Sequence, residues 1–316
     1  MPIEDIVIVK YSKEKKEEWD KFVGNSKNGI FLFFRDYIEY HSDKFTDQSL
    51  MFYKDDKLIA IFPANITRNT LFSHAGLTFG GFITDNKMTT PTMLRLFQSL
   101  IEYAEANSIN KIIYKCIPYI YHSLPADEDR YALFRINAKL FRRDITSTIY
   151  LPEKIQFQES RYRCIRKAKL ANVEVKRTDC FKSYWQILEE NLAKAHNTKP
   201  VHSIEEIEYL YNKFPDNIKL FVACKNEDIL AGVVIYESKN VAHAQYIASA
   251  EKGRAIGALD MIFDYLINEY YKNKKYFDFG ISTEKDGLYL NEGLIFFKEG
   301  FGARGIVHDF YEVNIE

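Results

Sequence analysis

The sequence predicts an α/β protein made of two units, each with a mixed β-sheet flanked by helices. Short apolar runs alternate with longer segments in which apolar residues recur at helical spacing. The two halves of the chain also repeat one coarse order of elements, in which two strands around a polar turn precede a further strand, a long helix and an apolar strand. We therefore expect one domain at residues 1–152 and a second at residues 153–316, separated near Pro152.

Composition is typical of a folded, soluble protein. The 316 residues are 47% hydrophobic and 28% charged, with a formal net charge of −1, so no global field favours nucleic acid or an anionic membrane. The N-terminal residues lack the order of a signal peptide, and no apolar run approaches the roughly 20 residues of a membrane span. We expect a cytoplasmic protein without membrane insertion. The four cysteines are scattered, which favours neither disulfides nor a metal site.

In the first half, two strands and one helix are clearly marked. The strands Leu50–Tyr53 and Leu58–Ala64 flank a polar turn. A further strand is expected at Leu77–Ile83, and a helix from about Pro91 to Asn107 leads to an apolar strand at Lys111–Tyr114.

The second half shows the same pattern more strongly. The strands Lys219–Cys224 and Ile229–Tyr236 again flank a polar turn. A strand at Ala242–Ala248 leads through a glycine-containing loop to an amphipathic helix, Ala255–Tyr271, and then to a strand at Lys275–Phe279.

The glycine-containing loop is the most informative feature of the chain. Backbone N–H groups and the dipole at a helix N-terminus can hold a phosphate or pyrophosphate. An ordinary turn between strand and helix is the alternative. The candidate phosphate-binding residues are Gly253, Arg254, Ala255, Ile256 and Gly257.

Several stretches together resemble a known family. The second half resembles the GNAT acyltransferase fold. The whole chain resembles the tandem-GNAT proteins of the FemAB type, particularly the acetyltransferase-like branch associated with bacterial surface polysaccharide synthesis in the cell envelope. The stretches that carry the resemblance are Asn28–His41, Ser73–Phe82, Arg163–Val175, Lys199–Leu210, His243–Asp260 and Phe277–Gly302.

The resemblance implies a transferase and a donor site. Most members of the superfamily use acyl-CoA, whereas the Fem peptidyltransferases use aminoacyl-tRNA. Arg254 and Gly257 match two places of the family's pyrophosphate loop, while Leu259 is bulkier than the residue expected at a third. The corresponding segment of the first half, residues 84–90, has no glycine, so the first unit is expected to shape the acceptor site and to bind no donor.

The resemblance also points to the last helix. GNAT enzymes often offer a tyrosine there as general acid, but this chain has Phe296 at that place, so Tyr289 or Lys298 would have to replace it. Lys298 matches the place of a Fem-type lysine implicated in stabilising the reacting groups. A lysine near a helix C-terminus is also favourable for the helix dipole alone.

Acyl transfer to an amine needs a proton acceptor and a group that polarises the carbonyl. His243 and Gln245 alternate with alanines on one strand, which predicts that they share a face. His243 is a candidate base, and a histidine bonded within the core is the alternative. Glu284, after the strand at Lys275–Phe279, is a second candidate base, or else a solvated loop acid.

A basic helix is a candidate for binding a charged substrate. Arg163, Arg166 and Lys167 share a helix face. They could meet the diphosphate of a nucleotide- or lipid-linked sugar, or the end of a tRNA, and a solvated charged face is the alternative.

A loop between two helices is expected to line the acceptor site. It contains His196, Lys199 and His202. The two histidines lack an acidic or cysteine partner, so we expect no metal there. In the first half, Ser73 and His74 precede the pair Gly80 and Gly81, which suggests either close approach of a ligand or a plain turn.

Three functions remain as hypotheses. The first is an N-acyltransferase that moves an acyl group from acyl-CoA to an amine of a sugar or glycan precursor by direct attack. The second is Fem-like transfer from aminoacyl-tRNA to a peptidoglycan precursor. The third is a ligand-binding protein whose catalytic site has decayed, because Leu259 and Phe296 depart from the expected pattern.

Overall fold

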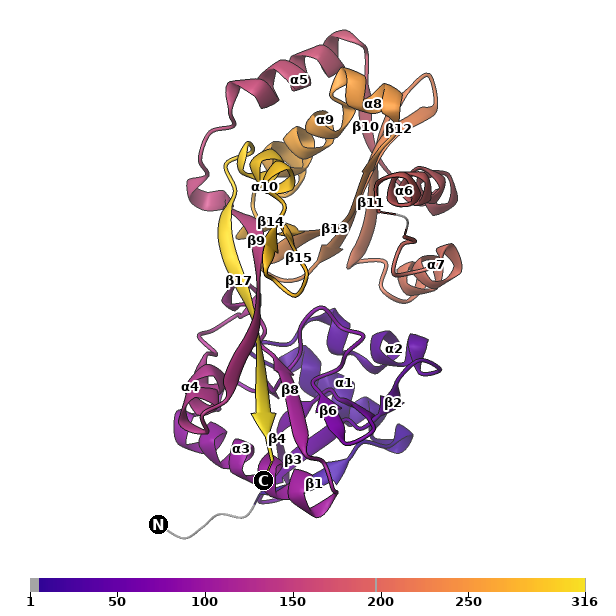
Figure 1. Ribbon diagram of the computed structural model, residues 1–316. Coiled ribbons are helices and arrows are strands. Elements are labelled where there is room, and N and C mark those ends of the chain that lie inside the picture. Colours follow the sequence, from indigo (N-terminus) through magenta and orange to yellow (C-terminus); the bar gives the residue numbers. More distant parts are fainter. Residues whose placement is uncertain (1–5, 197, 316) are drawn as a thin grey trace. The chain divides into compact units, whose positions relative to one another are not determined.

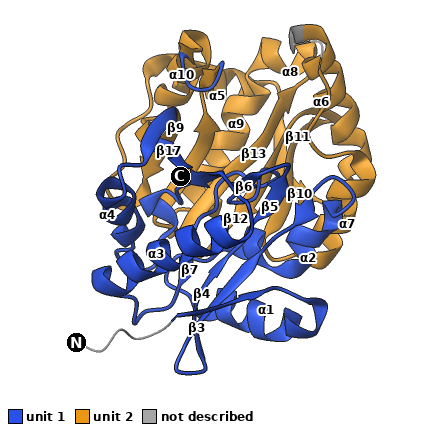
Figure 2. Ribbon diagram, turned by 60° about the horizontal axis from the view of Figure 1, so that its bottom comes forward, with its two compact units in different colours: residues 1–144, 285–288, 307–316 blue, residues 145–284, 289–306 orange. Residues whose placement is uncertain are grey.

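The structure, a computed structural model, describes residues 6–196 and 198–315. The chain divides into two compact units, coloured separately in Figure 2. Unit 1 contains residues 1–144, 285–288 and 307–316, and unit 2 contains residues 145–284 and 289–306. This division differs from the boundary expected near Pro152, because the strands β9 (Lys139–Tyr150) and β17 (Arg304–Asn314) each contribute residues to both units.

Unit 1 contains strands in two groups. An antiparallel sheet has the order β1-β3-β4-β7, formed by Val7–Lys10, Leu50–Lys54, Lys57–Phe62 and Ile83–Thr84. The second group has the order β17-β8-β6-β5-β2, in which β8 is Lys111–Lys115, β6 is Thr70–Phe72, β5 is Asn65–Thr67 and β2 is Thr46–Asp47. Only β6 and β8 are parallel among these described pairs.

The helices of unit 1 are short apart from α3, which packs on its sheets. Met93, Leu96 and Phe97 of α3 are buried with Phe82 and Tyr114. The α-helices are α1 (Lys16–Asn25), α2 (Arg35–Ile38), α3 (Thr90–Ala106) and α4 (Glu128–Arg135). Short 3-10 helices lie at η1 (Lys13–Lys15), η2 (Phe31–Phe33), η3 (Glu39–His41) and η4 (Tyr119–Tyr121).

Unit 2 is built on six neighbouring strands of one sheet. Their order is β10-β11-β12-β13-β14-β9, and only β13 and β14 are parallel among these pairs. The first five strands are Glu174–Thr178, Ile218–Lys225, Asp228–Glu237, Val241–Ser249 and Tyr276–Ile281. A small hairpin follows, formed by β15 (Thr283–Glu284) and β16 (Tyr289–Leu290).

Helices cover both faces of the unit 2 sheet (Figure 1). Val233 and Ile235 of β12 face α9 and belong to its core cluster, whereas Gly232, the residue before Val233, lies against the ring of Tyr184 in α6. The helices are α5 (Glu159–Leu170), α6 (Phe181–His196), α7 (Ile204–Lys213), α8 (Glu251–Ile256), α9 (Ala258–Tyr265) and α10 (Glu292–Glu299). A 3-10 turn, η5 (Leu151–Glu153), precedes them, and a π-turn, η6 (Leu266–Tyr270), extends α9.

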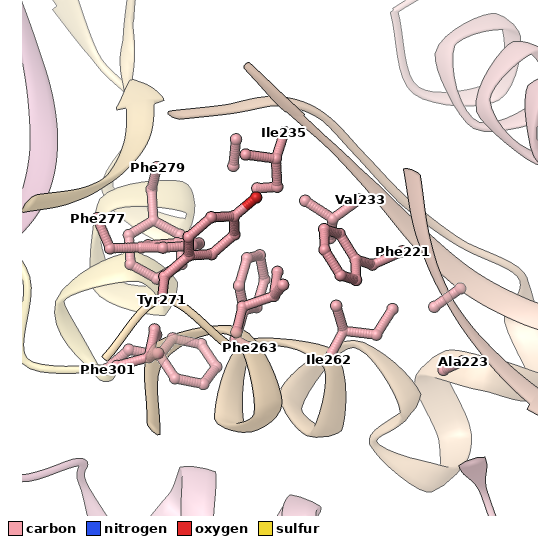
Figure 3. Packing of buried hydrophobic residues seen from close by; sticks show 14 of the residues in the cluster. Phe221, Ala223, Val233, Ile235, Ile262, Phe263, Tyr271, Phe277, Phe279 and Phe301 are labelled. Carbon is pink, nitrogen blue, oxygen red and sulfur yellow. The ribbon is translucent and has the colours of Figure 1, made fainter. Parts of the chain in front are cut away.

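An aromatic cluster forms the core between α9 and the sheet (Figure 3). The ring of Phe263 lies 4.8 Å from that of Phe279 and 5.2 Å from that of Phe301. Phe277 and Tyr271 complete the cluster from β14 and the end of the π-turn. These contacts hold α9 against β14, the strand that carries part of the candidate site.

Two predicted elements are wrong. Residues 77–82 form no strand and only β7 follows, because the turns around Gly80 and Gly81 occupy this segment. The helix predicted at Ala255–Tyr271 is interrupted at Gly257, whose φ of +78° separates α8 from α9. The mixed α/β fold class is confirmed.

We expect the Phe263→Ala variant to lose about 3–5 kcal/mol of unfolding free energy, because a fully buried ring is removed from a packed cluster. Urea denaturation measures the loss. Leu170→Ala in α5 is the control, since Leu170 is 86% exposed. Equal losses in the two variants would contradict the packing described.

Candidate functional site

The centre of unit 2 holds a histidine–aspartate pair. β13 pairs with β14 over Val241–His243 only, and the last pair places His243 opposite Asp278. Nδ1 of His243 lies 2.6 Å from Oδ2 of Asp278. The Asp278 side chain is fully buried, whereas 13% of the His243 side chain is exposed. A carboxylate at Nδ1 holds the proton on that nitrogen, which leaves Nε2 able to accept one.

Two threonines hold the other oxygen of Asp278. Thr146 and Thr148 are two residues apart on β9, so both hydroxyls point to the same face of the strand. Both donate to Oδ1 of Asp278, Thr148 over 2.8 Å. A charge buried in a protein must be hydrogen-bonded, and these contacts meet that requirement on both carboxylate oxygens.

A buried lysine lies at the end of β14. Nζ of Lys298, in α10, donates to the carbonyl oxygens of Gly280 and Ile281 over 2.8 and 2.7 Å. Burial lowers the pKa of Lys298 to about 8, and the charge of Asp278 acts in the opposite direction. The ammonium is therefore still mostly charged at neutral pH, and it loses its proton more readily than an exposed lysine does.

Gly280 allows this arrangement. Its φ of +77° is in the left-handed region, which favours glycine, and a Cβ there would lie 3.4 Å from Cε1 of His243. The register of β14 with β9 shifts between Asp278 and Ile281. The shift turns the strand end so that its carbonyl groups meet Lys298.

β13 and β14 separate beside the His243–Asp278 pair. In the described residues, no strand pairs with the β14-facing side of β13 after His243. On its other side, β13 is bulged against β12, because Val234 pairs with Tyr246 and Ile235 with Ala244, leaving Gln245 as the extra residue. The open edge of β13 can pair with an extended chain that carries amide groups.

The bulge changes which residue lies on the same face of β13 as His243. Simple alternation placed Gln245 on the face of His243, but the extra residue gives that face to Tyr246 instead. Tyr246 packs against Trp185 of α6, with ring centroids 5.1 Å apart, and its hydroxyl lies 2.5 Å from Nδ1 of His202. His202 is therefore a buried residue that joins the predicted acceptor loop to β13.

Other predicted residues lie on the surface. Glu284 and Tyr289 are cross-strand partners in the β15–β16 hairpin, both exposed, and Glu284 accepts a hydrogen bond from Asn291. Phe296 is 62% exposed. Lys199 is exposed, and the side chain of His196 lies outside the described residues.

The predicted glycine loop is helical rather than open. Gly253 lies within α8, buried against the carbonyl of Leu230. A Cβ on Gly257 would lie 2.5 Å from the backbone oxygen of Cys164 in α5. Arg254 donates to the carbonyl of Ser249 over 2.6 Å. Of the predicted segment from Gly253 to Gly257, Ala255 and Ile256 complete α8.

The first turn of α9 carries its own carboxylate. Asp260 lies 3.0 Å from Nη1 of Arg161 in α5, and burial raises the pKa of Asp260 while Arg161 opposes this. A negative side chain already complements the helix dipole at this position. The first turn of α8, which directly follows β13, is another group of backbone amides at a helix start.

The basic face of α5 is partly paired. Arg166 lies 2.5 Å from Glu159. Arg163 and Lys167 are exposed and form no ion pair with any residue that the structure describes.

Sequence reasoning missed Asp278, Thr146 and Thr148. Asp278 had a visible signal, since it stands between Phe277 and Phe279 in an otherwise apolar strand. The threonines had none, because they lie more than 100 positions before Asp278. Across residues 6–196 and 198–315, no three His, Cys, Asp or Glu side chains are grouped as a metal site would require. No helix within these ranges has the length and apolar character of a membrane span.

No protein-family model matches the sequence, and no curated protein matches it. Solved structures match nearly the whole chain. FemX is 13% identical over 96% of both chains, with a TM-score of 0.65. L-PGS from Bacillus licheniformis is 13% identical over 96% of this chain and 92% of its own, with a TM-score of 0.60. A tandem GNAT protein from the clavulanic acid biosynthesis pathway is 8% identical over 99% of both chains, with a TM-score of 0.53.

Identities this low carry information about the fold alone. All three neighbours extend over both units described above. The chain thus has the tandem GNAT fold of the FemAB-like type.

Proposed function

We propose that unit 2 is an N-acyltransferase that moves an acyl group from acyl-CoA to an amine of a sugar or cell-surface glycan precursor. The observation that carries the proposal is the position of the His243–Asp278 pair, at the point where β13 and β14 separate. A base at this point would lie beside any donor arm that enters along the open edge of β13.

The reaction proposed is direct attack. The amine nitrogen forms a bond to the thioester carbonyl carbon, and the C–S bond breaks. Nε2 of His243 takes the proton of the amine and returns it to the departing thiolate. Asp278 keeps the imidazole oriented and balances its positive charge.

Lys298 would contribute positive charge near the reacting carbonyl. Its ammonium is buried and lies close enough to Asp278 for the two charges to interact. In a water-poor site, a fixed positive charge stabilises negative charge that develops on a carbonyl oxygen.

The open edge of β13 favours a CoA donor, because the pantetheine arm is extended and carries amides that can pair with a strand edge. The first-turn amides of α8, which include that of Gly253 from the predicted segment, are the proposed contact for the diphosphate. Arg163, Lys167 and the loop that ends at His202 remain the proposed acceptor contacts.

A second candidate is transfer from aminoacyl-tRNA. Two observations favour it: Asp260 already occupies the first turn of α9, and Arg163 and Lys167 leave exposed positive charge on α5. An aminoacyl-tRNA donor would use the exposed positive charge on α5. It would not need free amides in the first turn of α9 to hold a CoA diphosphate.

We expect purified protein to release CoA from acetyl-CoA when amino-sugar nucleotides are supplied. A thiol-reactive dye measures the release. A tRNA gel shift that weakens with salt, without CoA release, would favour the second candidate. The absence of both CoA release and a tRNA gel shift across a broad panel of acceptors would contradict the proposal.

Replacing the base should slow transfer strongly. We expect His243→Ala to lower kcat/KM by about 10²–10⁴-fold. Asp278→Asn combined with His243→Ala should be no worse than His243→Ala alone, since the two act as a unit. Glu284→Gln is the matched control, because it removes the exposed rival base. A large loss in Glu284→Gln with an active His243→Ala would reverse the assignment.

The rate should decline at alkaline pH. The pKa of Lys298 is about 8, below the ordinary value for lysine, so its charge disappears as the pH rises through 8. We expect kcat/KM to fall between pH 7 and pH 9 in the wild type. Lys298→Met should be slower at pH 7 by about 10²-fold and lack this decline. The same alkaline decline in Lys298→Met would show that another group causes it.

A further inference from the structure

A turn in unit 1 gathers buried polar side chains that the proposed transfer does not use. The turn contains His74–Leu77 and is closed by a bond from the Leu77 amide to the His74 carbonyl. Oδ1 of Asn65 accepts a hydrogen bond from the Ala75 amide over 2.7 Å. Nζ of Lys115, at the end of β8, donates to the carbonyl oxygens of Ala75 and Leu77. Asn65 and Lys115 thus meet the same turn from two different strands.

Lys115 is a buried lysine whose only hydrogen-bond acceptors in the described residues are these two carbonyls. No carboxylate pairs with it there. Lys27, another buried lysine of unit 1, has Glu128 2.5 Å away. Burying an ammonium without an anion is unfavourable, because no opposite charge replaces the lost hydration. Burial, with a smaller effect from Arg142, lowers the pKa of Lys115 to about 7.

Two further polar atoms at the turn are unpaired. Nδ2 of Asn65 and Nδ1 of His74 are buried without a hydrogen-bond partner among the residues described. Since Oδ1 of Asn65 already accepts from Ala75, its Nδ2 is a free donor. His74 also has a φ of +59°, an unfavourable backbone conformation for a residue other than glycine. Unpaired buried donors and local strain together are typical of ligand sites.

The surroundings of His74 are positive. Burial lowers the pKa of His74 to about 3, and the charges of His41, Lys115 and Arg35 act in the same direction. Asp47 opposes them, but it is already paired with Arg35. The ring of His41 stacks on that of His74, with centroids 5.3 Å apart. A negative group is therefore the missing complement at this turn.

We propose that Asn65, His74 and Lys115 form a binding site for a small oxyanion, a carboxylate or phosphate group, beneath the His74–Leu77 turn. The side chains offer nitrogen donors, and an oxyanion satisfies such donors with short charge-assisted bonds. Close packing limits the size of the ligand, because a Cβ on Gly76 would lie 2.5 Å from Nε2 of His41. Ala75 is exposed, so a small, solvent-facing turn separates the cluster from water. The site does not depend on the transfer proposed for unit 2.

Acetate and sulfate are the probes, one planar and one tetrahedral, and neither titrates between pH 6 and pH 8. Calorimetry should detect one saturable site for at least one of them, and the preferred probe assigns carboxylate or phosphate chemistry. We expect binding to be about tenfold weaker at pH 8 than at pH 6, because free Lys115 loses its charge through pH 7. NMR of isotope-labelled lysine side chains should show Lys115 gaining a proton on binding. This result distinguishes protonation of Lys115 from protonation of His41. His74, whose pKa is lowered to about 3, stays neutral over this range.

Variants test the position of the site. Asn65→Asp places a carboxylate where the ligand would bind, so we expect it to abolish binding of both probes and to raise the pKa of Lys115. Asn69→Asp is the matched control, since it makes the same charge change at an exposed position of the adjacent β5–β6 turn and should leave binding unchanged. Lys115→Met removes the unpaired charge, and it should fold and lose binding. The proposal is overturned if neither probe binds the wild type at pH 6, or if binding survives in Lys115→Met.

Discussion

The buried carboxylate of Asp278 is the constraint on which the centre of unit 2 depends. A charge without solvent must have every oxygen engaged, and here each engagement fixes another element. One oxygen requires His243 at the end of the parallel pairing of β13 and β14. The other requires two threonines on one face of β9. Side-chain hydrogen bonds therefore join the three neighbouring strands β13, β14 and β9, and these strands together orient the imidazole of His243.

The irregular features of unit 2 lie close to this carboxylate. The bulge at Gln245, the shift of β14 against β9 and the left-handed Gly280 all fall within a few residues of the His243–Asp278 pair. Regular strands would carry their pairing onward and close the edge of β13. The irregularities end the pairing of β13 with β14 at the His243–Asp278 pair and leave the edge of β13 open. Bulges are common next to active sites.

The fold class and most elements of unit 2 could be predicted, because strands covered on both faces show as apolar runs and α9 has a clear apolar face. His243 and Lys298 were also found as candidates. The bulge could not be found, since one extra residue leaves the local alternation unchanged until the partner strand is known. The α8 segment was interpreted as a loop because glycine is a poor helix former, yet packing of Gly253 under Leu230 overrides that preference. The partners of Asp278 depend on pairing between distant segments, which a local pattern does not contain.

The strand β17 has a consequence for how this chain acquires its structure. Residues Phe310–Asn314 pair with Lys111–Lys115, so the strand that holds Lys115 receives one of its two partners from a segment much later in the sequence. During synthesis, that edge of β8 stays uncovered until residues Phe310–Asn314 have left the ribosome. Until then, one edge of β8 is unpaired although its other edge can pair with β6, and an exposed strand edge is a liability for which chaperones exist.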